Sequence, residues 1–483
     1  MNMKRKILAL TLCLTTAFGL FGCGNDDEGS RDSNSGDSSI INGGNNNGSN
    51  ISTDGFIHVT DTILVPQTDA GTYAIVYNDT VLSESFEENI SDREDSLDGS
   101  IGTILTDESL YVVTENRITP VAQDVKKAAL SSFGDGIVYI TPSSSEDYYV
   151  NHYDIQTGRA TLCGEVQNHI QIAISPDGDT VVYASEEAVM LWQNNQSVKI
   201  CDDQYKLIGV SNAAAQIYLI NSEGILYSFD RNGNRTKLGA SDGHISDITL
   251  NADHSQILFY YEDKSYISTD GQEAQILRGG KMQIILPNTC YYGGSTCPVT
   301  DFYGHAYYGD DKAWLIQQDS EDSCKLISKA SYPRLDASSN YLYYIYDGEE
   351  LRCIKISDGD KASEKCKTIV NDDITGSFFV TSDRSLVYYL DRDKLLCCSG
   401  KKAGASNEIC DDVTHPYCMG KDDTLYFRIN DDLYACSDGE NYKKIGNDIE
   451  GVFADLSGRV YCYSDDSLYY VENATLHKLL DLP

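Results

Sequence analysis

One stretch of the chain gathers side chains that suit ligand binding. Residues 286–311 read LPNTCYYGGSTCPVTDFYGHAYYGDD and concentrate tyrosines among glycines. Tyrosine rings on loops can stack on sugars or on peptide side chains, so this segment is the best candidate for ligand contact. The predicted contact residues are Tyr291, Tyr292, Tyr303 and His305. The alternative is that these rings cover the edge of a sheet, with Tyr307 and Tyr308 inside a strand.

Cysteines offer a second kind of chemistry. Cys290 and Cys297 lie in the same segment, among glycine and proline, and we predict a local disulfide between them. Outside this segment, cysteines occupy a repeat position that Gly239, Val370 and Gly446 hold elsewhere, which indicates small buried filler. These cysteines are Cys163, Cys201 and Cys410. The chain has no CxxC pair, so neither a zinc site nor a thioredoxin-like site is predicted.

Acidic turns such as those at 177–179, 391–393, 430–432 and 464–466 suggest calcium at first sight. None has the alternating run with a distal Glu that a calcium loop requires, and Asp and Asn are common in hairpin turns. The eight histidines form no HExxH pair, and no G-x-S-x-G elbow exists. We therefore predict no catalytic residue, no metal and no cofactor. A polysaccharide-cleaving enzyme, which needs only two or three converging carboxylates, stays open among 74 acidic residues.

The charge balance excludes one class of partner. Lys plus Arg number 37 and Asp plus Glu number 74, so the formal charge is −37. Such a surface repels a phosphate backbone, and we predict no binding to nucleic acid.

The N-terminus has the features of an export signal. Three basic residues, Lys4 to Lys6, precede an apolar run at 7–22 that is shorter than the roughly 20 residues that span a bilayer. The run ends in Leu20-Phe21-Gly22-Cys23, which resembles the lipobox of bacterial lipoproteins. This resemblance implies that residues 1–22 are a signal peptide and that Cys23 carries the lipid that anchors the protein to the membrane, on its extracytoplasmic face.

After the anchor the composition changes twice. Residues 23–54 are rich in Gly, Ser, Asn and Asp and contain almost no apolar groups, so we predict a disordered tether. From about residue 103 a pattern recurs every 40 residues or so: a β-rich segment, an acidic turn, a second strand, a short edge strand and an alternating strand. Two segments, at 83–95 and 123–130, show a helical period longer than a turn or two. Residues 55–100 can supply one more divergent repeat or a strand that closes a ring.

Four short strands per 40 residues predict the blades of a β-propeller, an all-β fold. The segment SPDGDTVVYAS (175–185) resembles the TolB-type propeller repeat. The cadence of LYYIYDGEELRCIKISDGD (342–360) resembles extracytoplasmic propellers of the low-density-lipoprotein-receptor type. We expect one propeller domain at 55–483, with about eight to ten blades in a single ring or with two tandem rings.

The predicted fold suggests a general role but does not indicate a ligand, because a sequence repeat identifies the fold and not the binding site. We predict a surface-anchored lipoprotein that acts as a non-catalytic scaffold binding a protein, peptide or glycan. Two alternatives stay open: an extracytoplasmic enzyme acting on polysaccharide, and an accessory sensor or assembly subunit of a membrane complex.

Overall fold

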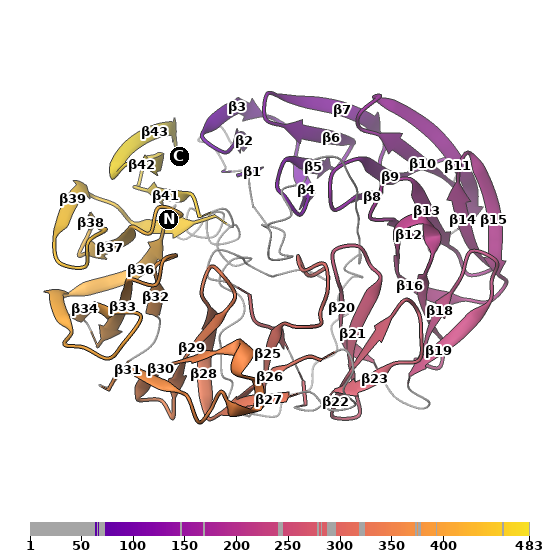
Figure 1. Ribbon diagram of the computed structural model, residues 1–483. Helices are drawn as coiled ribbons and strands as arrows, with labels where there is room; N and C mark the ends of the chain where they lie inside the picture. The colour runs from indigo at the N-terminus through magenta and orange to yellow at the C-terminus, as the bar shows by residue number, and fades with distance from the viewer. Residues whose placement is uncertain are drawn as a thin grey trace, which may run out of the picture.

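The strands of this chain are arranged as a ring of antiparallel sheets. The computed structural model describes residues 63–64, 66 and 73–482, with gaps at 145–146, 168–169, 240–244, 278–279, 282, 287–295, 318–323, 372–373, 375–377, 393 and 456–457. The described strands form eleven sheets, ten of four strands and one of three. Each sheet is one uninterrupted stretch of chain, and Figure 1 shows the sheets following one another around a ring. We call them blades 1 to 11 in chain order.

Blade 1 contains β1 (Ile63–Leu64), β2 (Tyr73–Tyr77) and β3 (Thr80–Phe86). Blade 2 contains β4 (Ile90–Asp95), β5 (Ile101–Thr106), β6 (Ser109–Thr114) and β7 (Arg117–Gln123). Blade 3 contains β8 (Lys127–Leu130), β9 (Gly136–Pro142), β10 (Asp147–Asp154) and β11 (Arg159–Gln167). Blade 4 contains β12 (Gln171–Ile174), β13 (Thr180–Ala184), β14 (Val189–Gln193) and β15 (Gln196–Cys201).

Blade 5 contains β16 (Tyr205–Val210), the 3-10 helix η1 (Asn212–Ala214), β17 (Ile217–Asn221), β18 (Leu226–Phe229) and β19 (Arg235–Gly239). Blade 6 contains β20 (Ser246–Leu250), β21 (Gln256–Tyr261), β22 (Lys264–Thr269) and β23 (Gln275–Leu277). Blade 7 contains β24 (Gln283–Ile284), β25 (Ala306–Gly309), β26 (Lys312–Leu315) and β27 (Cys324–Ser328). Blade 8 contains β28 (Ala330–Leu335), β29 (Tyr341–Tyr346), β30 (Glu350–Lys355), the 3-10 helix η2 (Ile356–Lys361) and β31 (Lys367–Val370).

Blade 9 contains β32 (Phe378–Val380), β33 (Leu386–Asp391), β34 (Lys394–Ser399) and β35 (Asn407–Cys410). Blade 10 contains β36 (Val413–Met419), β37 (Leu425–Ile429), β38 (Asp432–Cys436) and β39 (Tyr442–Gly446). Blade 11 contains β40 (Gly451–Ala454), β41 (Val460–Tyr463), β42 (Ser467–Glu472) and β43 (Thr475–Asp481). The two segments with a helical period form strands instead, in β3, β4 and β8, because their apolar residues pack between blades.

Within a four-stranded blade, the first strand lies nearest the centre of the ring and the fourth lies at the rim (Figure 1). The alternating segments that end each sequence repeat, such as 169–175 and 244–250, therefore supply the innermost strands β12 and β20. The short edge strand of the repeat is confirmed as the outermost one. Side chains that contact anything at the centre of the ring must come from the first strands and the turns that follow them.

A recurrent turn joins the first and second strands. In blade 4 the hydroxyl of Ser175 accepts the N–H of Thr180 at 3.0 Å, and the N–H of Gly178 donates to the Ser175 carbonyl at 2.9 Å. Gly178 has a φ of +66°, which glycine adopts without steric cost. The turn also links blades, because Asp177 accepts the N–H of Ala213 in blade 5 at 2.8 Å. The SPDG of the repeat is thus a turn motif of the fold.

Nine of the described outermost strands carry a β-bulge, where one extra apolar residue turns toward the core and shifts the register. After the bulge, Cys201 and Cys410 pair with the third strand as Gly239, Val370 and Gly446 do, which confirms their equivalence. Cys163 is instead a bulged residue, one place earlier than predicted. The bulged residues are Val121, Cys163, Ile200, Leu238, Leu326, Ile369, Ile409, Ile445 and Leu479.

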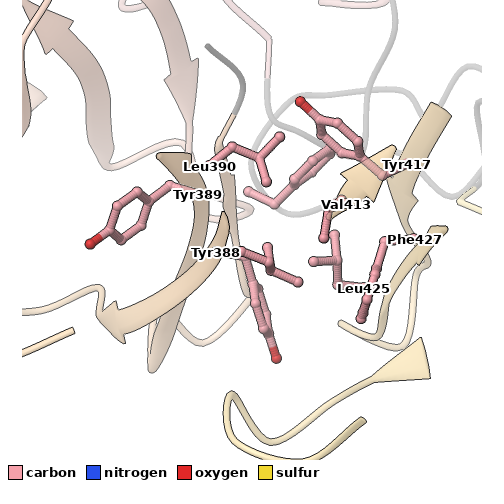
Figure 2. Close-up of a pocket in the computed structure, with 9 residues that line it drawn as sticks. Tyr388, Tyr389, Leu390, Val413, Tyr417, Leu425 and Phe427 are labelled. Carbon is pink, nitrogen blue, oxygen red and sulfur yellow. The ribbon is translucent and has the colours of Figure 1, made fainter. Parts of the chain in front are cut away.

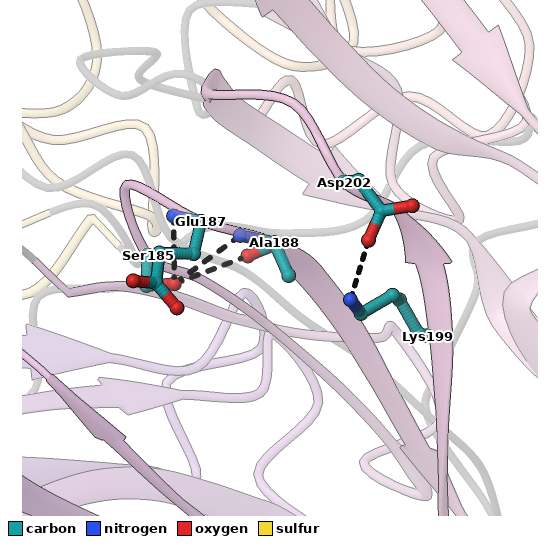
Figure 3. Close-up of polar contacts among 5 residues, drawn as sticks. All are labelled: Ser185, Glu187, Ala188, Lys199 and Asp202. Carbon is teal, nitrogen blue, oxygen red and sulfur yellow. Dashed lines mark hydrogen bonds and ion pairs between the residues drawn. The ribbon is translucent and has the colours of Figure 1, made fainter.

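The rim of each blade is an open sheet edge, which charged side chains protect from pairing with other chains. Figure 3 shows an example in blade 4, where Lys199 of β15 forms an ion pair with Asp202. The same view shows the hairpin between β13 and β14, in which the hydroxyl of Ser185 accepts the N–H groups of Glu187 at 3.2 Å and of Ala188 at 3.3 Å. Hydroxyls and acids in these turns serve the hairpins.

Hydrophobic clusters fill the interface between every two neighbouring blades, and one more joins the last blade to the first. At this closure Leu64 and Val76 of blade 1 pack on Leu480 and Tyr461 of blade 11. The Tyr461 hydroxyl also donates to the carbonyl of Asn78 at 2.9 Å. The β-propeller is therefore confirmed as one ring, and it has one blade more than the upper end of the predicted range. The divergent residues 63–86 supply that extra blade.

Candidate functional site: the inner wall of blades 8 to 10

The structure places part of the tyrosine-rich segment against blade 6. Residues 296–302 run beside its innermost strand, with Thr296 bridged to Leu250 and the N–H of Ala252 donating to the Val299 carbonyl at 2.9 Å. Phe302 and Cys297 are fully buried. This stretch is an extra piece of sheet edge, held by backbone bonds.

The predicted contact residues in the segment have different surroundings. Tyr303 is half-buried in the core between blades 6 and 7, and its hydroxyl accepts a hydrogen bond from Thr269 at 3.3 Å. His305 is also half-buried, and desolvation lowers its pKa. Tyr307 is fully buried within β25, as the alternative interpretation predicts. The contact role of Tyr303 and His305 stays a prediction.

The other predictions for this segment and for the N-terminus lie outside the described residues. They concern Tyr291, Tyr292, the signal peptide, the lipid on Cys23, the tether and the Cys290 half of the proposed disulfide. Its other half, Cys297, is buried against blade 6. The disulfide stays a prediction.

A buried histidine joins residues 296–302 to blades 5 and 6 by hydrogen bonds. His254 lies in the turn after β20 with a φ of +57° and is fully buried. Its Nδ1 donates to the carbonyl of Val210 in blade 5 at 3.0 Å, and its Nε2 accepts from the hydroxyl of Thr296 at 3.3 Å. Desolvation lowers the pKa of His254 to about 4. The imidazole is therefore neutral at pH 7 and joins blade 5, blade 6 and the added segment.

Sequence reasoning misses a different set of aromatic residues, on the innermost strands of blades 8, 9 and 10. Phe379 of β32 and Tyr417 of β36 are half-buried, and their rings meet edge to face with centroids 5.9 Å apart. Tyr332 of β28 is 45% exposed. We call Tyr332, Arg334, Phe379 and Tyr417 the inner wall.

Arg334 of β28 connects these aromatic residues. Its guanidinium carbon lies 5.3 Å from the ring centre of Phe379 and 5.8 Å from that of Phe378. The side chain is half-buried, and desolvation lowers its pKa while Tyr417 raises it. Cation, phenyl ring and phenol thus form a continuous path across three blades, a surface that can hold both a flat apolar face and a negative charge.

The backbone at Tyr332 is strained. Its φ is +50°, and the register of β28 against β29 shifts between Ser331 and Arg334. A left-handed conformation costs roughly 1–2 kcal/mol in a residue with a Cβ. Glycine would adopt this conformation without that cost.

An apolar crevice lies behind Phe379 and Tyr417, between blades 9 and 10, with about 220 Å³ of unfilled space including its mouth. Figure 2 shows Tyr388 and Leu390 of β33 facing Val413, Leu425 and Phe427 of blade 10, with Tyr417 above them and Tyr389 turned away. Its lining is almost wholly hydrocarbon, so it offers no chemistry of its own.

The ionisable groups near these blades have no metal-binding geometry. Across the described ranges, no three His, Cys, Asp or Glu side chains gather to hold a metal ion. Buried thiols line the interface between blades 9 and 10, and desolvation raises the pKa of Cys397 and of Cys410 to about 12. These thiols are protonated at neutral pH and act as packing groups.

Comparisons with known proteins find similarity in fold only. No protein-family model and no curated protein matches this sequence. Solved structures that match include the tricorn protease (TM-score 0.27, 12% identity, 81% of this chain and 48% of that one). PorZ, a surface component of the type-IX secretion system of Porphyromonas gingivalis, also matches (TM-score 0.29, 11% identity, 81% and 59%). TolB from Acinetobacter baumannii matches as well (TM-score 0.26, 12% identity, 51% and 57%).

This chain thus spans about half of the tricorn chain and less than two thirds of the PorZ and TolB chains. Similarity this distant carries no information about ligand or activity. Within the part of the chain that the structure describes, no helix is both long enough and apolar enough to cross a membrane.

Proposed function

We propose that this protein is a non-catalytic binding protein, anchored outside the cytoplasm by a lipid on Cys23, that contacts its ligand with the inner wall. The observation that supports the contact surface is the continuity of Arg334, Phe379 and Tyr417 across three blades. The innermost strands of other blades carry aliphatic residues, as in the QIAI of β12, or an aromatic residue that packs between blades, as Phe453 of β40 does against Tyr461. Half-exposed rings at the centre of a ring are reachable by a ligand and add little to the core.

Tyr332→Gly tests the contact surface without weakening the fold. Glycine relieves the backbone strain at a φ of +50°, so we expect the melting temperature to stay level or rise. Loss of one stacking ring should weaken ligand binding roughly three- to tenfold. The measurement is binding of the full-length protein to a glycan and peptide array, beside a thermal melt. Tyr442→Ala is the control, because Tyr442 has a similar exposure of 41% but lies on the rim strand β39.

Two results would contradict this assignment. One is an unchanged array pattern in the Tyr332→Gly protein. The other is a loss of binding in the Tyr442→Ala protein that equals the loss in Tyr332→Gly, since that would place the ligand at the rim or show a general effect on folding.

The anchor is tested separately. We expect Cys23→Ala to release the protein from the membrane fraction, because the thiol of Cys23 is the predicted attachment point of the lipid. The measurement is fractionation of cells, with a high-salt wash to remove proteins held by charge alone. If the variant stays with the washed membranes, the lipid is not what holds it there.

A further inference from the structure

We propose that Arg334 binds the carboxylate of an acidic sugar whose ring stacks on Phe379, Tyr417 or Tyr332. This inference rests on the inner wall as the ligand site and adds the chemistry of the ligand. Its starting point is that the guanidinium of Arg334 has cation–π contacts with Phe378 and Phe379, and no hydrogen-bond acceptor or carboxylate among the described residues.

The other arginines of blades 8 to 10 that are at least half-buried all have polar partners. Arg352 Nε lies 2.8 Å from a carboxylate oxygen of Glu350. Arg384 Nε donates to the hydroxyl of Tyr343 at 2.9 Å, and Arg428 donates to Asp431 at 3.1 Å. Arg334 differs from these three, because among the described residues only rings lie against its guanidinium.

The acid nearest to Arg334 in the sequence is engaged elsewhere. Asp336, two residues further along the chain, is buried in the turn after β28. Its carboxylate accepts the N–H of Tyr341 at 2.8 Å and the hydroxyl of Ser338 at 2.6 Å. A guanidinium presents five N–H donors in a fixed fork, which match a carboxylate in two parallel bonds. The N–H donors of Arg334 therefore have no acceptor among the described residues, and the carboxylate of a ligand would supply one.

The charge of the whole protein narrows the choice of anion. At a formal charge of −37, the surface repels a polyanion over a distance of several ångströms in physiological salt. A ligand with one carboxylate on an otherwise uncharged body avoids this penalty and still pairs with Arg334. A nucleic acid or a highly sulfated polymer does not.

The rings around Arg334 favour a sugar as that body. Phe379 and Tyr417 are half-buried and meet edge to face, so each ring is partly open to a ligand. Aromatic faces stack on the C–H groups of a pyranose, whereas a bulky apolar side chain of a peptide is held best in a pocket. The crevice behind the rings opens between two blades and is narrow for such a side chain.

The test uses the full-length protein on an array of matched glycan pairs, in which each uronic or sialic acid glycan stands beside its neutral counterpart. Peptides with free and amidated C-termini are printed on the same array. We expect the protein to prefer the acidic member of at least one glycan pair. Arg334→Met should lower that binding roughly tenfold or more and should leave the neutral member unchanged. Arg334→Lys should recover part of the loss, because it restores the charge without the fork.

Arg352→Met is the matched control, since it removes an arginine of the same blade that already has a carboxylate partner, and its array pattern should not change. Equal binding of acidic and neutral glycans, with both lost in Tyr332→Gly, would overturn the role of Arg334 and leave the inner wall as the binding site. Preference for free peptide C-termini over every glycan would contradict the assignment of the ligand as a sugar. If the array shows no binding that the inner-wall variants alter, the proposed site itself fails.

Discussion

Ending the chain after Asp448 should abolish cooperative folding. This truncation removes blade 11 and uncovers two apolar faces, one on blade 10 and one on blade 1. At least six large side chains lose their cover, and each contributes roughly 1.5–3 kcal/mol when fully buried, so the loss is on the order of 10 kcal/mol. That equals the whole stability of a typical domain. The truncated protein should aggregate, and its melt should be broad.

The measurements are size-exclusion chromatography and calorimetry of the truncated and full-length proteins. Tyr461→Phe is the control, because it keeps the apolar closure and removes only the hydrogen bonds of the hydroxyl to Asn78 and Asp455. It should cost about 1 kcal/mol and leave the melt cooperative. A truncated chain that stays monomeric and melts as sharply as the full ring would mean that closure contributes little.

Acid should weaken the protein through His254. An unfolded histidine takes up a proton near pH 6.5, whereas the buried His254 has a pKa of about 4. Between these values the unfolded chain binds more protons than the folded one, so stability falls as the pH falls. From pH 7 to pH 4 this single group should cost about 3 kcal/mol.

His254→Asn isolates that effect. Asn tolerates the positive φ and does not titrate, but it is too short to reach both Val210 and Thr296. At pH 7 the variant should be less stable by about 2–4 kcal/mol, and this gap should shrink by about 3 kcal/mol at pH 4. Denaturant unfolding at both pH values measures it, with His477→Asn on the outer strand β43 as the control. A gap that stays constant with pH would refute the neutral, buried imidazole.

The sequence repeat predicts most of the fold. Each unit contains one alternating strand, two β-rich strands and an edge strand, and these periods persist along the chain because every blade buries the same faces. Blade 1 is harder to predict, since its three strands at 63–86 share few of the motif residues. The short edge strands are predicted as strands, but the bulges in them are not, because sequence spacing alone does not reveal a shift in register.

The inner wall is not predictable from the repeat, for a physical reason. Tyr332, Phe379 and Tyr417 lie in unlike segments, SYPRL, SFFV and HPYCM, and bulges in β28 and β36 break their alignment. They become neighbours only when three blades pack side by side. The sequence holds only a weak signal, because aromatic residues also occur on the innermost strands of other blades, such as Tyr205 of β16 and Phe453 of β40. The tyrosines at 286–311 give a stronger signal in the sequence, yet Tyr303 and Tyr307 pack into the core.

Each described blade is a single uninterrupted stretch of chain, and no described strand of the last blade joins the sheet of the first. A gene encoding such a protein can gain or lose a segment of about 40 codons at any link and still specify a complete module at every position. The diameter can then change by small steps while the side chains of the remaining modules keep their neighbours. Eleven blades is on this view one member of a series of ring sizes.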